Sequence, residues 1–293
     1  MGIILDEIDG KIWFDGELIN WKDAKIPVLT HGLHYASCVF EGDRCYNGKI
    51  FKLHEHSQRL IASGKIMGFD VPYTAEELDA ACNLVCEANG LTDAYVRPVA
   101  WRGSKALGVS ARENPVHVAI AAWEWPSYFT LEQKMAGLRL KTSSWCRPAP
   151  NTAPVAAKAS GLYMICTLTK HEMEDAGYDD ALMLDYRGYV AESTGSNIFL
   201  YMDDGKLHTP IPDCFLNGIT RQTVIQIAKD LGIEVVERHI KPEEFAQTKE
   251  VFVTGTAIEV TPVASIDDYQ FNPGETSRKI MEAYEKLTGK LTV

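Results

Sequence analysis

The chain of 293 residues is long enough to form two domains of ordinary size, or one large domain, with a sizeable core. Its apolar content of 46% and charged content of 24% are those of an ordinary globular protein. The 40 acidic residues outnumber the 29 basic ones and give a net charge of −11 without any basic block, so nucleic acid and anionic membranes are poor candidates as partners.

Cysteine usage and the lack of long apolar runs indicate a cytoplasmic protein. The seven cysteines are scattered, odd in number and never spaced as C-x-x-C, which is typical of reduced, mostly buried thiols. The first ten residues, MGIILDEIDG, lack the basic start of a secretion signal. No apolar run approaches the roughly 20 residues of a membrane span. We therefore expect neither export nor membrane insertion.

The first part of the chain predicts strands joined by tight turns. Residues 11–20 alternate around Asp15-Gly16, and residues 39–51 contain Asn47-Gly48 between two apolar runs; both are hairpin signals. Further along, two apolar segments predict buried strands, over residues 94–101 and 116–123.

Two helices are predicted between these strands. The first covers residues 54–67, with Leu60, Ile61 and Met67 facing inward. The second begins at the capping box Thr74-x-x-Glu77 and ends at Gly90. Its apolar stripe consists of Leu78, Ala81, Cys82, Val85 and Cys86.

A polar stretch without pattern, residues 129–136, is the predicted linker between a small N-terminal domain, 1–128, and a larger C-terminal domain, 137–293. The second domain mixes strands and helices without strict alternation, which indicates an α+β fold rather than a doubly wound sheet. Its predicted strands are 138–145, several within 181–209, 234–238, 251–254 and 258–262. Its predicted helices are 161–176, 220–232 with Val224, Ala228 and Leu231 on one face, and 276–287.

One lysine stands out for its chemistry. Lys158 follows a Pro-rich turn and lies among small residues, with Ala156-Ala157 before it and Ala159-Ser160-Gly161 after it. An amine in such a setting can sit in a dry pocket, where desolvation favours the neutral, nucleophilic form that a Schiff-base lysine needs. A surface lysine at the start of an alanine-rich helix is the alternative, because most lysines are exposed.

Three features point to anion binding. Gly218-Ile219-Thr220 opens a helix, whose free N–H groups and dipole suit a phosphate. Thr254-Gly255-Thr256-Ala257 ends a strand with small residues that let donors approach a ligand, and Arg59 offers a fork for phosphate oxygens. The alternatives are an ordinary cap, an ordinary turn and a solvated arginine. Without G-x-G-x-x-G or G-x-x-x-x-G-K-[ST], a nucleotide is the poorer candidate.

An acid and two histidine pairs complete the candidate residues. Glu192 precedes a turn of small polar residues whose N–H groups can position its carboxylate, although it also suits a plain β-turn. His54-x-His56 and His31-x-x-His34 have no matching carboxylate spacing, so no metal site is predicted.

Together these segments resemble the class IV pyridoxal-phosphate aminotransferases, and most closely the branched-chain amino acid aminotransferases. No single segment is decisive, but the set comes in the family's order and spans roughly residues 11–265. The matching segments are HGLHYASCVFEG with Arg44, HEHSQRL, AYVRP, SSWCRPAPNTAPVAAKASGLY, AESTGSNIF, NGITR and VTGTAIEVTPV.

The resemblance implies pyridoxal 5'-phosphate as cofactor. Lys158 resembles the Schiff-base lysine that moves a proton between the substrate α-carbon and C4′ of the cofactor. Glu192 matches the acid that keeps the pyridine nitrogen protonated, which makes the ring an electron sink. Tyr163 matches the tyrosine that hydrogen-bonds the ring hydroxyl. The implied phosphate-binding positions are Arg59, Ile219, Thr220 and Thr256.

On the substrate side, the resemblance implies one pocket for both leucine-like side chains and the γ-carboxylate of glutamate. Tyr35 and Arg97 resemble the polar groups that accept the carboxylate. The α-carboxylate would meet backbone N–H groups near Thr256 and Ala257. The implied apolar walls are Phe40, Val109, Trp125 and Tyr128.

The implied fold is the α+β, two-domain fold type IV, similar to D-amino acid aminotransferase. A small N-terminal α/β domain accompanies a larger C-terminal pseudo-barrel domain. The implied reaction is reversible transamination between L-leucine, isoleucine or valine and 2-oxoglutarate, which gives branched-chain 2-oxo acids and L-glutamate. Family members self-associate as homodimers or hexamers, with the Tyr35 and Val109 loops reaching the neighbour's site.

The sequence departs from the family pattern at two places. Asn217 stands where many members have proline, which leaves the phosphate site intact in principle. The segment Trp101–Ala106 near the pocket rim is not the commonest version, so side-chain preference stays open. The sequence also leaves open the ranking among leucine, isoleucine and valine, the choice between dimer and hexamer, and the physiological direction.

Two classes of alternative remain. The first is a sister activity on the same fold: a D-amino acid aminotransferase, an (R)-selective amine transaminase or an aminodeoxychorismate lyase. The second is a cofactor-free binding or scaffold protein in which Lys158 is incidental. Colour with added cofactor separates the second from the rest, and the response to L-leucine against D-alanine separates the first.

Overall fold

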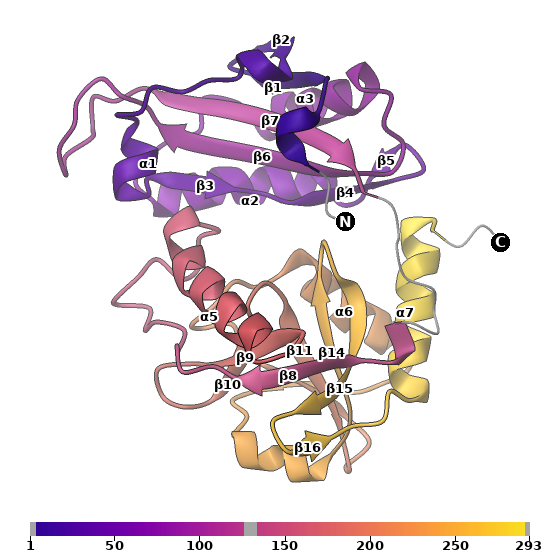
Figure 1. Ribbon diagram of the computed structural model, residues 1–293. Coiled ribbons are helices and arrows are strands. Elements are labelled where there is room, and N and C mark those ends of the chain that lie inside the picture. Colours follow the sequence, from indigo (N-terminus) through magenta and orange to yellow (C-terminus); the bar gives the residue numbers. More distant parts are fainter. Residues whose placement is uncertain (1–3, 126–133, 291–293) are drawn as a thin grey trace. The chain divides into compact units, whose positions relative to one another are not determined.

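The computed structural model describes residues 4–125 and 134–290 (Figure 1). They form two compact units. The N-terminal unit consists of residues 4–125 and 157–161, and the C-terminal unit of residues 134–156 and 162–290.

The short segment that carries Lys158 belongs to the N-terminal unit, although the chain before and after it belongs to the C-terminal one. Of the predicted linker, 129–136, only residues 134–136 lie within the described part. The predicted wall residue Tyr128 lies outside it.

The N-terminal unit contains an antiparallel sheet in the order β2-β1-β7-β6-β4-β5, with β3 beside β6. Both predicted hairpins are confirmed: β1 pairs with β2 across Asp15-Gly16, and β4 with β5 across Asn47-Gly48. Both turns have two residues of positive φ, +48° and +103° in the first and +49° and +77° in the second, as a type I′ turn requires. The strands are β1 Lys11–Phe14, β2 Glu17–Asn20, β3 Cys38–Phe40, β4 Asp43–Tyr46, β5 Lys49–Ile50, β6 Ala94–Arg102 and β7 Val116–Glu124.

The two faces of this sheet differ in chemistry because side chains alternate along β6 and β7. One face is apolar and packs against α2 and α3 (Figure 1); its buried residues are Ala94, Val96, Ala100, Val118, Ile120 and Ala122. The opposite face carries aromatic rings and an arginine: Tyr95, Arg97, Trp101 and Trp123. The second face therefore has the groups with which a ligand can interact.

Three α-helices belong to this unit: α1 His31–Tyr35, α2 Leu53–Ile66 and α3 Ala75–Ala88. The capping box of α3 is confirmed in full, and its whole predicted apolar stripe is buried. Helix α2 differs from prediction, because Ile61 and Met67 are only partly buried. The inward face of α2 is largely polar or small, with His56, Ser57, Leu60, Ser63 and Gly64 buried. Two single-turn 3₁₀ segments, Leu5–Glu7 and Trp21–Asp23, complete the unit.

The C-terminal unit is built on a ring of six strands. Each of β8, β9, β10, β11, β14 and β15 pairs with the next, and β15 pairs back with β8, so the ring closes. The predicted barrel-like sheet is confirmed. The ring strands are β8 Leu138–Thr142, β9 Asp180–Leu184, β10 Val190–Ser193, β11 Asn197–Met202, β14 Thr248–Gly255 and β15 Glu259–Ile266. Three strands extend it: β12 Leu207–Pro210, β13 Val235–Arg238 and β16 Tyr269–Gln270.

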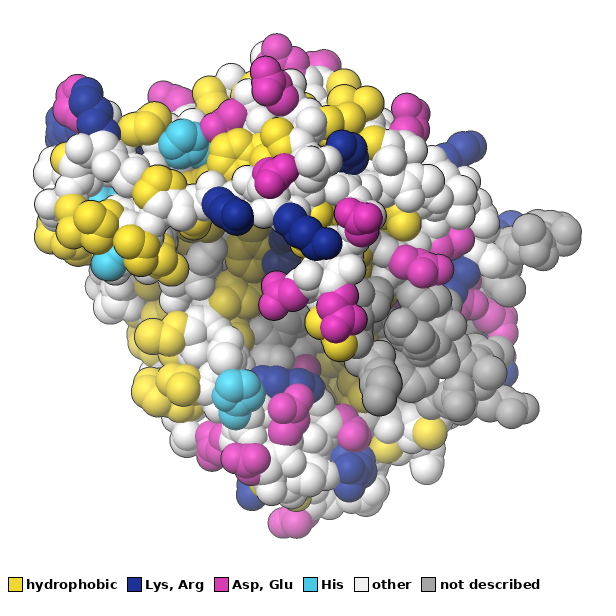
Figure 2. Space-filling view, turned by 45° about the horizontal axis from the view of Figure 1, so that its top comes forward, with side chains coloured by type: hydrophobic (Ala, Val, Ile, Leu, Met, Phe, Trp, Pro, Cys, Tyr) yellow, Lys and Arg dark blue, Asp and Glu magenta, His cyan; other side chains and the backbone are white. Residues whose placement is uncertain are grey.

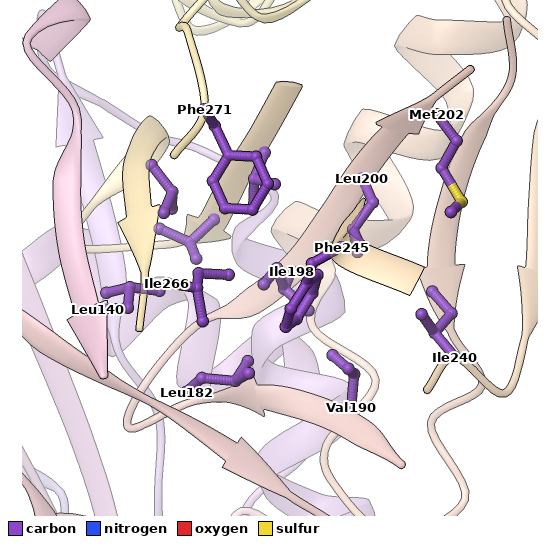
Figure 3. Close-up of a cluster of buried hydrophobic side chains, with 13 residues drawn as sticks. Leu140, Leu182, Val190, Ile198, Leu200, Met202, Ile240, Phe245, Ile266 and Phe271 are labelled. Carbon is purple, nitrogen blue, oxygen red and sulfur yellow. The ribbon is translucent and has the colours of Figure 1, made fainter. Parts of the chain in front are cut away.

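Apolar side chains from all six ring strands form one buried core (Figure 3). Leu140, Leu182, Val190, Ile198 and Ile266 are at most 2% exposed. Phe245 and Phe271 come from segments outside the ring and complete this core. Burial of these side chains is the main source of stability for such a unit, at roughly 1.5–3 kcal/mol for each large one.

The ring is flanked by helices α5 Tyr163–Asp175, α6 Ile219–Asp230 and α7 Glu275–Thr288, and the chain also forms 3₁₀ segments at Ser160–Leu162 and Pro242–Gln247. In α6, Val224 and Ala228 are buried as predicted. Leu231, predicted on the same face of the helix, is 44% exposed and lies just beyond the end of α6. No helix in the described part of the chain is both long and apolar enough to cross a membrane.

Candidate functional site

Lys158 is held in the N-terminal unit through its own backbone. Its carbonyl accepts a hydrogen bond of 3.1 Å from Phe40 N–H, and its N–H donates one of 3.0 Å to Ser63 Oγ. The next residue, Ala159, forms a β-bridge with Val39. Ala159 is 1% exposed, so the small residues around Lys158 let this segment lie directly against β3. The lysine Nζ then lies 4.9 Å from the centre of the Phe40 ring.

Arg97 contacts the same aromatic ring. Its guanidinium carbon lies 4.8 Å from the centre of Phe40 and 5.1 Å from that of Tyr95, and Nη2 donates to Tyr95 Oη at 3.2 Å. Its Nε is buried and has no hydrogen-bond partner among the described residues. A buried donor without a partner is costly, so this atom is a ready site for a ligand carboxylate.

Tyr95 connects Arg97 with Trp125. The Tyr95 ring centre lies 5.2 Å from that of Trp125 and 5.2 Å from that of Trp123. A Cβ atom at Gly42 would lie 2.0 Å from Tyr95 Oη, so only glycine permits this position of the ring. Tyr95 was not among the site residues predicted from the sequence. Its i, i+2 spacing from Arg97 on one strand could have revealed it.

Tyr35 and Val109 lie on an exposed corner of the same unit. The ring of His31 stacks on Tyr35 at 4.6 Å, and His31 Nε2 makes a hydrogen bond of 2.9 Å with the carbonyl of Gly108. Figure 2 shows apolar side chains gathered on the side of this unit where α1 lies in Figure 1. The exposed apolar residues of this corner are Val28 (74%), Leu29 (52%), Leu33 (64%), Tyr35 (44%), Leu107 (52%) and Val109 (87%).

Arg59 lies on α2 against two buried carboxylates. Glu41 accepts from Arg59 Nε and Nη2, both at 2.7 Å, and from His56 Nδ1 at 2.8 Å. Asp43 lies 3.0 Å from the same His56 nitrogen. Sequence spacing around His56 indicated no carboxylate partner, and the fold supplies two: Glu41, which follows β3, and Asp43, which begins β4.

The group of Glu41, Asp43 and His56 contains metal-ligand types, with ligand atoms within 4.8 Å of one another. Its chemistry does not fit a metal ion. Burial alone would lower the pKa of His56, but Asp43 and Glu41 outweigh burial and raise it to about 9. A protonated imidazole donates hydrogen bonds and does not bind a cation. Arg59 also uses both oxygens of Glu41.

In the C-terminal unit, Glu192 is buried at the end of the ring strand β10. Its Oε1 lies 2.8 Å from Arg147 Nη2, and its Oε2 accepts from Asn197 Nδ2 at 3.1 Å. Burial would lower the pKa of Arg147, but the Glu192 carboxylate outweighs burial and raises it. Tyr163, at the first turn of α5, contributes to the same rise. Arg147 therefore fixes the Glu192 carboxylate, the acid that was expected to bind the cofactor ring.

Asn197 connects Glu192 with the start of α6. Its Oδ1 accepts from Gly218 N–H at 3.2 Å, and its Nδ2 donates to Leu216 O as well as to Glu192. A Cβ atom at Gly218 would lie 2.2 Å from Asn197 Oδ1, so this approach requires glycine. Neither Asn197 nor Arg147 was selected from sequence. Both lie inside the quoted motifs, and only the fold shows their partners.

The start of α6 and the end of β14 meet through Asn197, which pairs in register with Thr254. No side chain caps α6 at Gly218, and Ile219 and Thr220 supply its first N–H groups. Thr254 Oγ1 is buried and has no hydrogen-bond partner among the described residues. A Cβ atom at Gly255 would lie 3.3 Å from Gly195 O and 3.2 Å from Ser196 Cβ, and the half-buried Thr256 and the exposed Ala257 follow. Uncapped N–H groups and an unpaired hydroxyl fit the phosphate of pyridoxal phosphate.

A known protein family matches most of the chain. The family model described as Amino-transferase class IV matches residues 38–266. A probable branched-chain-amino-acid aminotransferase from Rickettsia bellii is 45% identical over 281 residues, which are 94% of this chain and 95% of that protein. The branched-chain-amino-acid aminotransferase of Pseudomonas aeruginosa is 41% identical over 290 residues, 96% of this chain and 94% of that protein.

Solved structures agree with the sequence relatives. The branched-chain amino acid aminotransferase of T.th. with pyridoxamine 5'-phosphate has a TM-score of 0.93 and 42% identity, and the match covers 97% of this chain and 96% of that one. The same enzyme with N-(5'-phosphopyridoxyl)-L-glutamate has a TM-score of 0.91 with 42% identity and the same coverage, 97% and 96%.

Proposed function

Because the chain belongs to the class IV aminotransferase family, we propose that it catalyses transamination between L-branched-chain amino acids and 2-oxoglutarate, with pyridoxal phosphate as cofactor. The products are branched-chain 2-oxo acids and L-glutamate. One observation carries the choice of substrates: the Phe40 ring lies under both the Lys158 amine and the Arg97 guanidinium. This arrangement supports a pocket in which an apolar surface and a cation for a carboxylate would lie beside the same amine.

When bound, pyridoxal phosphate supplies an electron sink for the electron pair that remains on the substrate α-carbon after it loses its proton. Lys158 would hold the cofactor through its Nζ. The same amine would serve as the base that holds and moves the proton of the substrate α-carbon. The backbone bonds to Phe40 and Ser63 keep the lysine directed to one place during this transfer.

The other proposed cofactor contacts fall into two groups: residues that would bind the pyridine ring and residues that would bind the phosphate. Glu192 would bind the pyridine nitrogen and keep it protonated, with Arg147 and Asn197 fixing its carboxylate. Tyr163 would hydrogen-bond the ring hydroxyl. The phosphate would be bound by Arg59 with the N–H groups or hydroxyls of Ile219, Thr220 and Thr256.

On the substrate side, Phe40 and Trp125 would form apolar walls, to which Val109 and Tyr128 would add. Arg97 would bind the γ-carboxylate of glutamate, with Tyr35 as a second donor. Backbone N–H groups of Thr256 and Ala257 would bind the α-carboxylate. These assignments rest on the aromatic contacts of Arg97 and on the exposed strand end after Gly255.

We also propose self-association and a cytoplasmic location. The exposed apolar corner around α1 and Val109 has the character of an interface, and a second copy is the occupant that fits a homodimer or a hexamer. All seven cysteines are unpaired, as in a reducing compartment.

The test is the visible absorption spectrum of the purified protein, before and after L-leucine and then after 2-oxoglutarate. We expect a yellow band that bleaches with leucine and returns with the oxo acid. A band that responds to D-alanine but not to leucine would reassign the protein to a sister activity. Absence of colour after added cofactor would contradict the role of Lys158.

A further inference from the structure

Glu41, Asp43, His56 and Arg59 form a buried charged group on the helix-facing side of the N-terminal sheet. Its geometry sets the direction of the Arg59 side chain. Glu41 binds Nε and Nη2 with its two oxygens at 2.7 Å each, a bidentate fork that fixes the plane of the guanidinium. Glu41 is completely buried, whereas the Arg59 side chain is 17% exposed. An arginine has five N–H donors in one plane, so a guanidinium bound along one edge presents its other edge to a second anion.

Glu41 is fixed in turn by its neighbours. His56 Nδ1 lies 2.8 Å from Glu41 Oε2 and 3.0 Å from Asp43 Oδ1, and both carboxylates are at most 1% exposed. Burial, and after it the charge of Asp43, raises the pKa of the Cys82 thiol on α3 well above its ordinary value. The group therefore brings two acidic side chains together with a histidine and an arginine.

Stabilisation of the fold alone does not explain why this group is charged. The rest of this sheet face is apolar, and well-packed apolar residues are commonly as stabilising as buried ion pairs, or more so. A buried network of charges is better explained as a means of fixing a geometry, because each member has one low-energy arrangement. What it fixes here is the direction of Arg59.

The same two segments also hold Lys158. Phe40, the residue before Glu41, donates to the Lys158 carbonyl, and Ser63, one turn after Arg59 on α2, accepts from the Lys158 N–H. Arg59 and Lys158 are thus attached to the same strand end and the same helix.

We propose that Glu41 is a positioning residue, supported by His56 and Asp43, that directs the Arg59 guanidinium toward the cofactor phosphate while the adjoining residues hold Lys158. This inference rests on the proposed function. It assigns to Glu41 no contact with the cofactor or the substrate. Its specific consequence is that loss of the Glu41 carboxylate weakens recognition of the phosphate and spares recognition of the aldehyde.

The experiment compares two aldehydes, pyridoxal 5'-phosphate and pyridoxal, which lacks the phosphate. The full chain, freed of cofactor, is titrated with each while the absorbance of the lysine adduct is recorded. For Glu41→Gln we expect a loss of roughly 10- to 100-fold in affinity for pyridoxal phosphate, and less than about 3-fold for pyridoxal. Arg59→Ala should reproduce this pattern.

The chain offers a matched control in Glu244, which also binds an arginine through two oxygens, Arg238 at 2.7 and 3.1 Å. Glu244→Gln should change neither affinity. If Glu41→Gln does not fold, Glu41→Asp keeps the charge and withdraws the carboxylate by one methylene, and the same selective loss is expected.

Equal losses for the two aldehydes would overturn the positioning role and make Glu41 a purely structural residue. Unchanged affinity for pyridoxal phosphate would overturn it as well. If the unsubstituted chain bound neither aldehyde, the proposed function would fail, and the positioning role with it.

Discussion

In the N-terminal unit, a cation, Arg59, is held by a carboxylate that a histidine holds in turn, whereas in the C-terminal unit a carboxylate, Glu192, is held by an arginine and an amide. Both side chains are fixed by two or more short contacts. The first arrangement lies on one face of an open sheet, and the second lies at the end of a strand in a closed ring.

The two groups differ in whether one of their members can readily lose a proton. His56 carries a proton that it can lose at mildly alkaline pH, since its pKa is about 9. Arg147 cannot lose its proton in any useful range, and the amide of Asn197 does not titrate. Charge in the N-terminal group therefore depends on pH, whereas the C-terminal group keeps its hydrogen bonds from neutral to alkaline conditions.

The largest expected effect belongs to Lys158, which is a member of neither group. Lys158→Ala removes the cofactor linkage and the proton carrier together, so turnover with L-leucine should fall by roughly 1,000-fold or more. Steady-state assays measure this. Lys170→Ala, a change on α5, serves as the control and should keep full activity. Normal turnover in Lys158→Ala would refute its assigned role.

Substitution in the C-terminal group should have the next largest effect. Glu192→Gln leaves Arg147 without its buried counter-charge and the ring nitrogen without an acid partner. Loss of the acid that keeps the ring nitrogen protonated would weaken the electron sink in the transition state, so kcat should fall roughly 100-fold. The measurement is kcat with saturating L-leucine and saturating cofactor. A loss below about 3-fold would mean that Glu192 does not contact the cofactor ring.

Arg97 tests the dual pocket. Arg97→Ala should lower kcat/KM for 2-oxoglutarate and L-glutamate by roughly 10- to 100-fold, because only these substrates bring a second carboxylate. For L-leucine the change should stay within about 3-fold. Arg97→Lys keeps the charge and should recover part of the loss. Equal losses for both substrate types would remove Arg97 from side-chain recognition.

Titration of His56 should make the stability of the protein depend on pH, which the C-terminal group should not do. Its pKa rises from 6.5 in the unfolded chain to about 9 in the fold, so its contribution is fully present below pH 6.5 and is lost as the pH rises through 9. The free energy of unfolding should fall by about 1–3 kcal/mol between pH 7 and pH 10. His56→Gln should flatten this fall. An identical pH profile in both proteins would place the titrating group elsewhere.

The smallest effect is expected at Asn217, where the chain departs from the family pattern. Its Oδ1 accepts from Arg221 Nη1 at 3.0 Å, and Arg221 is buried at the start of α6. Asn217→Ala should cost about 1 kcal/mol and lower Tm by about 2–4 °C, with turnover unchanged. Thermal unfolding checks this. A large loss of cofactor affinity would show that Asn217 shapes the phosphate site directly.

Sequence patterns predicted secondary structure correctly where the structure depends on residues close together in the chain. The Asn47-Gly48 turn, the Thr74–Glu77 capping box and the apolar stripe of α3 each depend on residues two to four positions apart, and all were confirmed. On α2, the predicted inward position of Leu60 is confirmed, but Ile61 and Met67 are only partly buried, and the buried His56 and Ser63 are polar. Hydrophobic periodicity cannot find a buried face whose partners are charges and a backbone N–H.

The sequence by itself determined the family and the α+β class, because these follow from ordered motifs. It also predicts Lys158 as the reactive amine, from the small residues beside it. Only the tertiary structure decided which charges meet. Glu41 and Arg59 are 18 positions apart, and Arg147 and Glu192 are joined only through the pairing of separate segments. Strand register sets which side chains share a face, and register is a property of the assembled sheet rather than of any one segment.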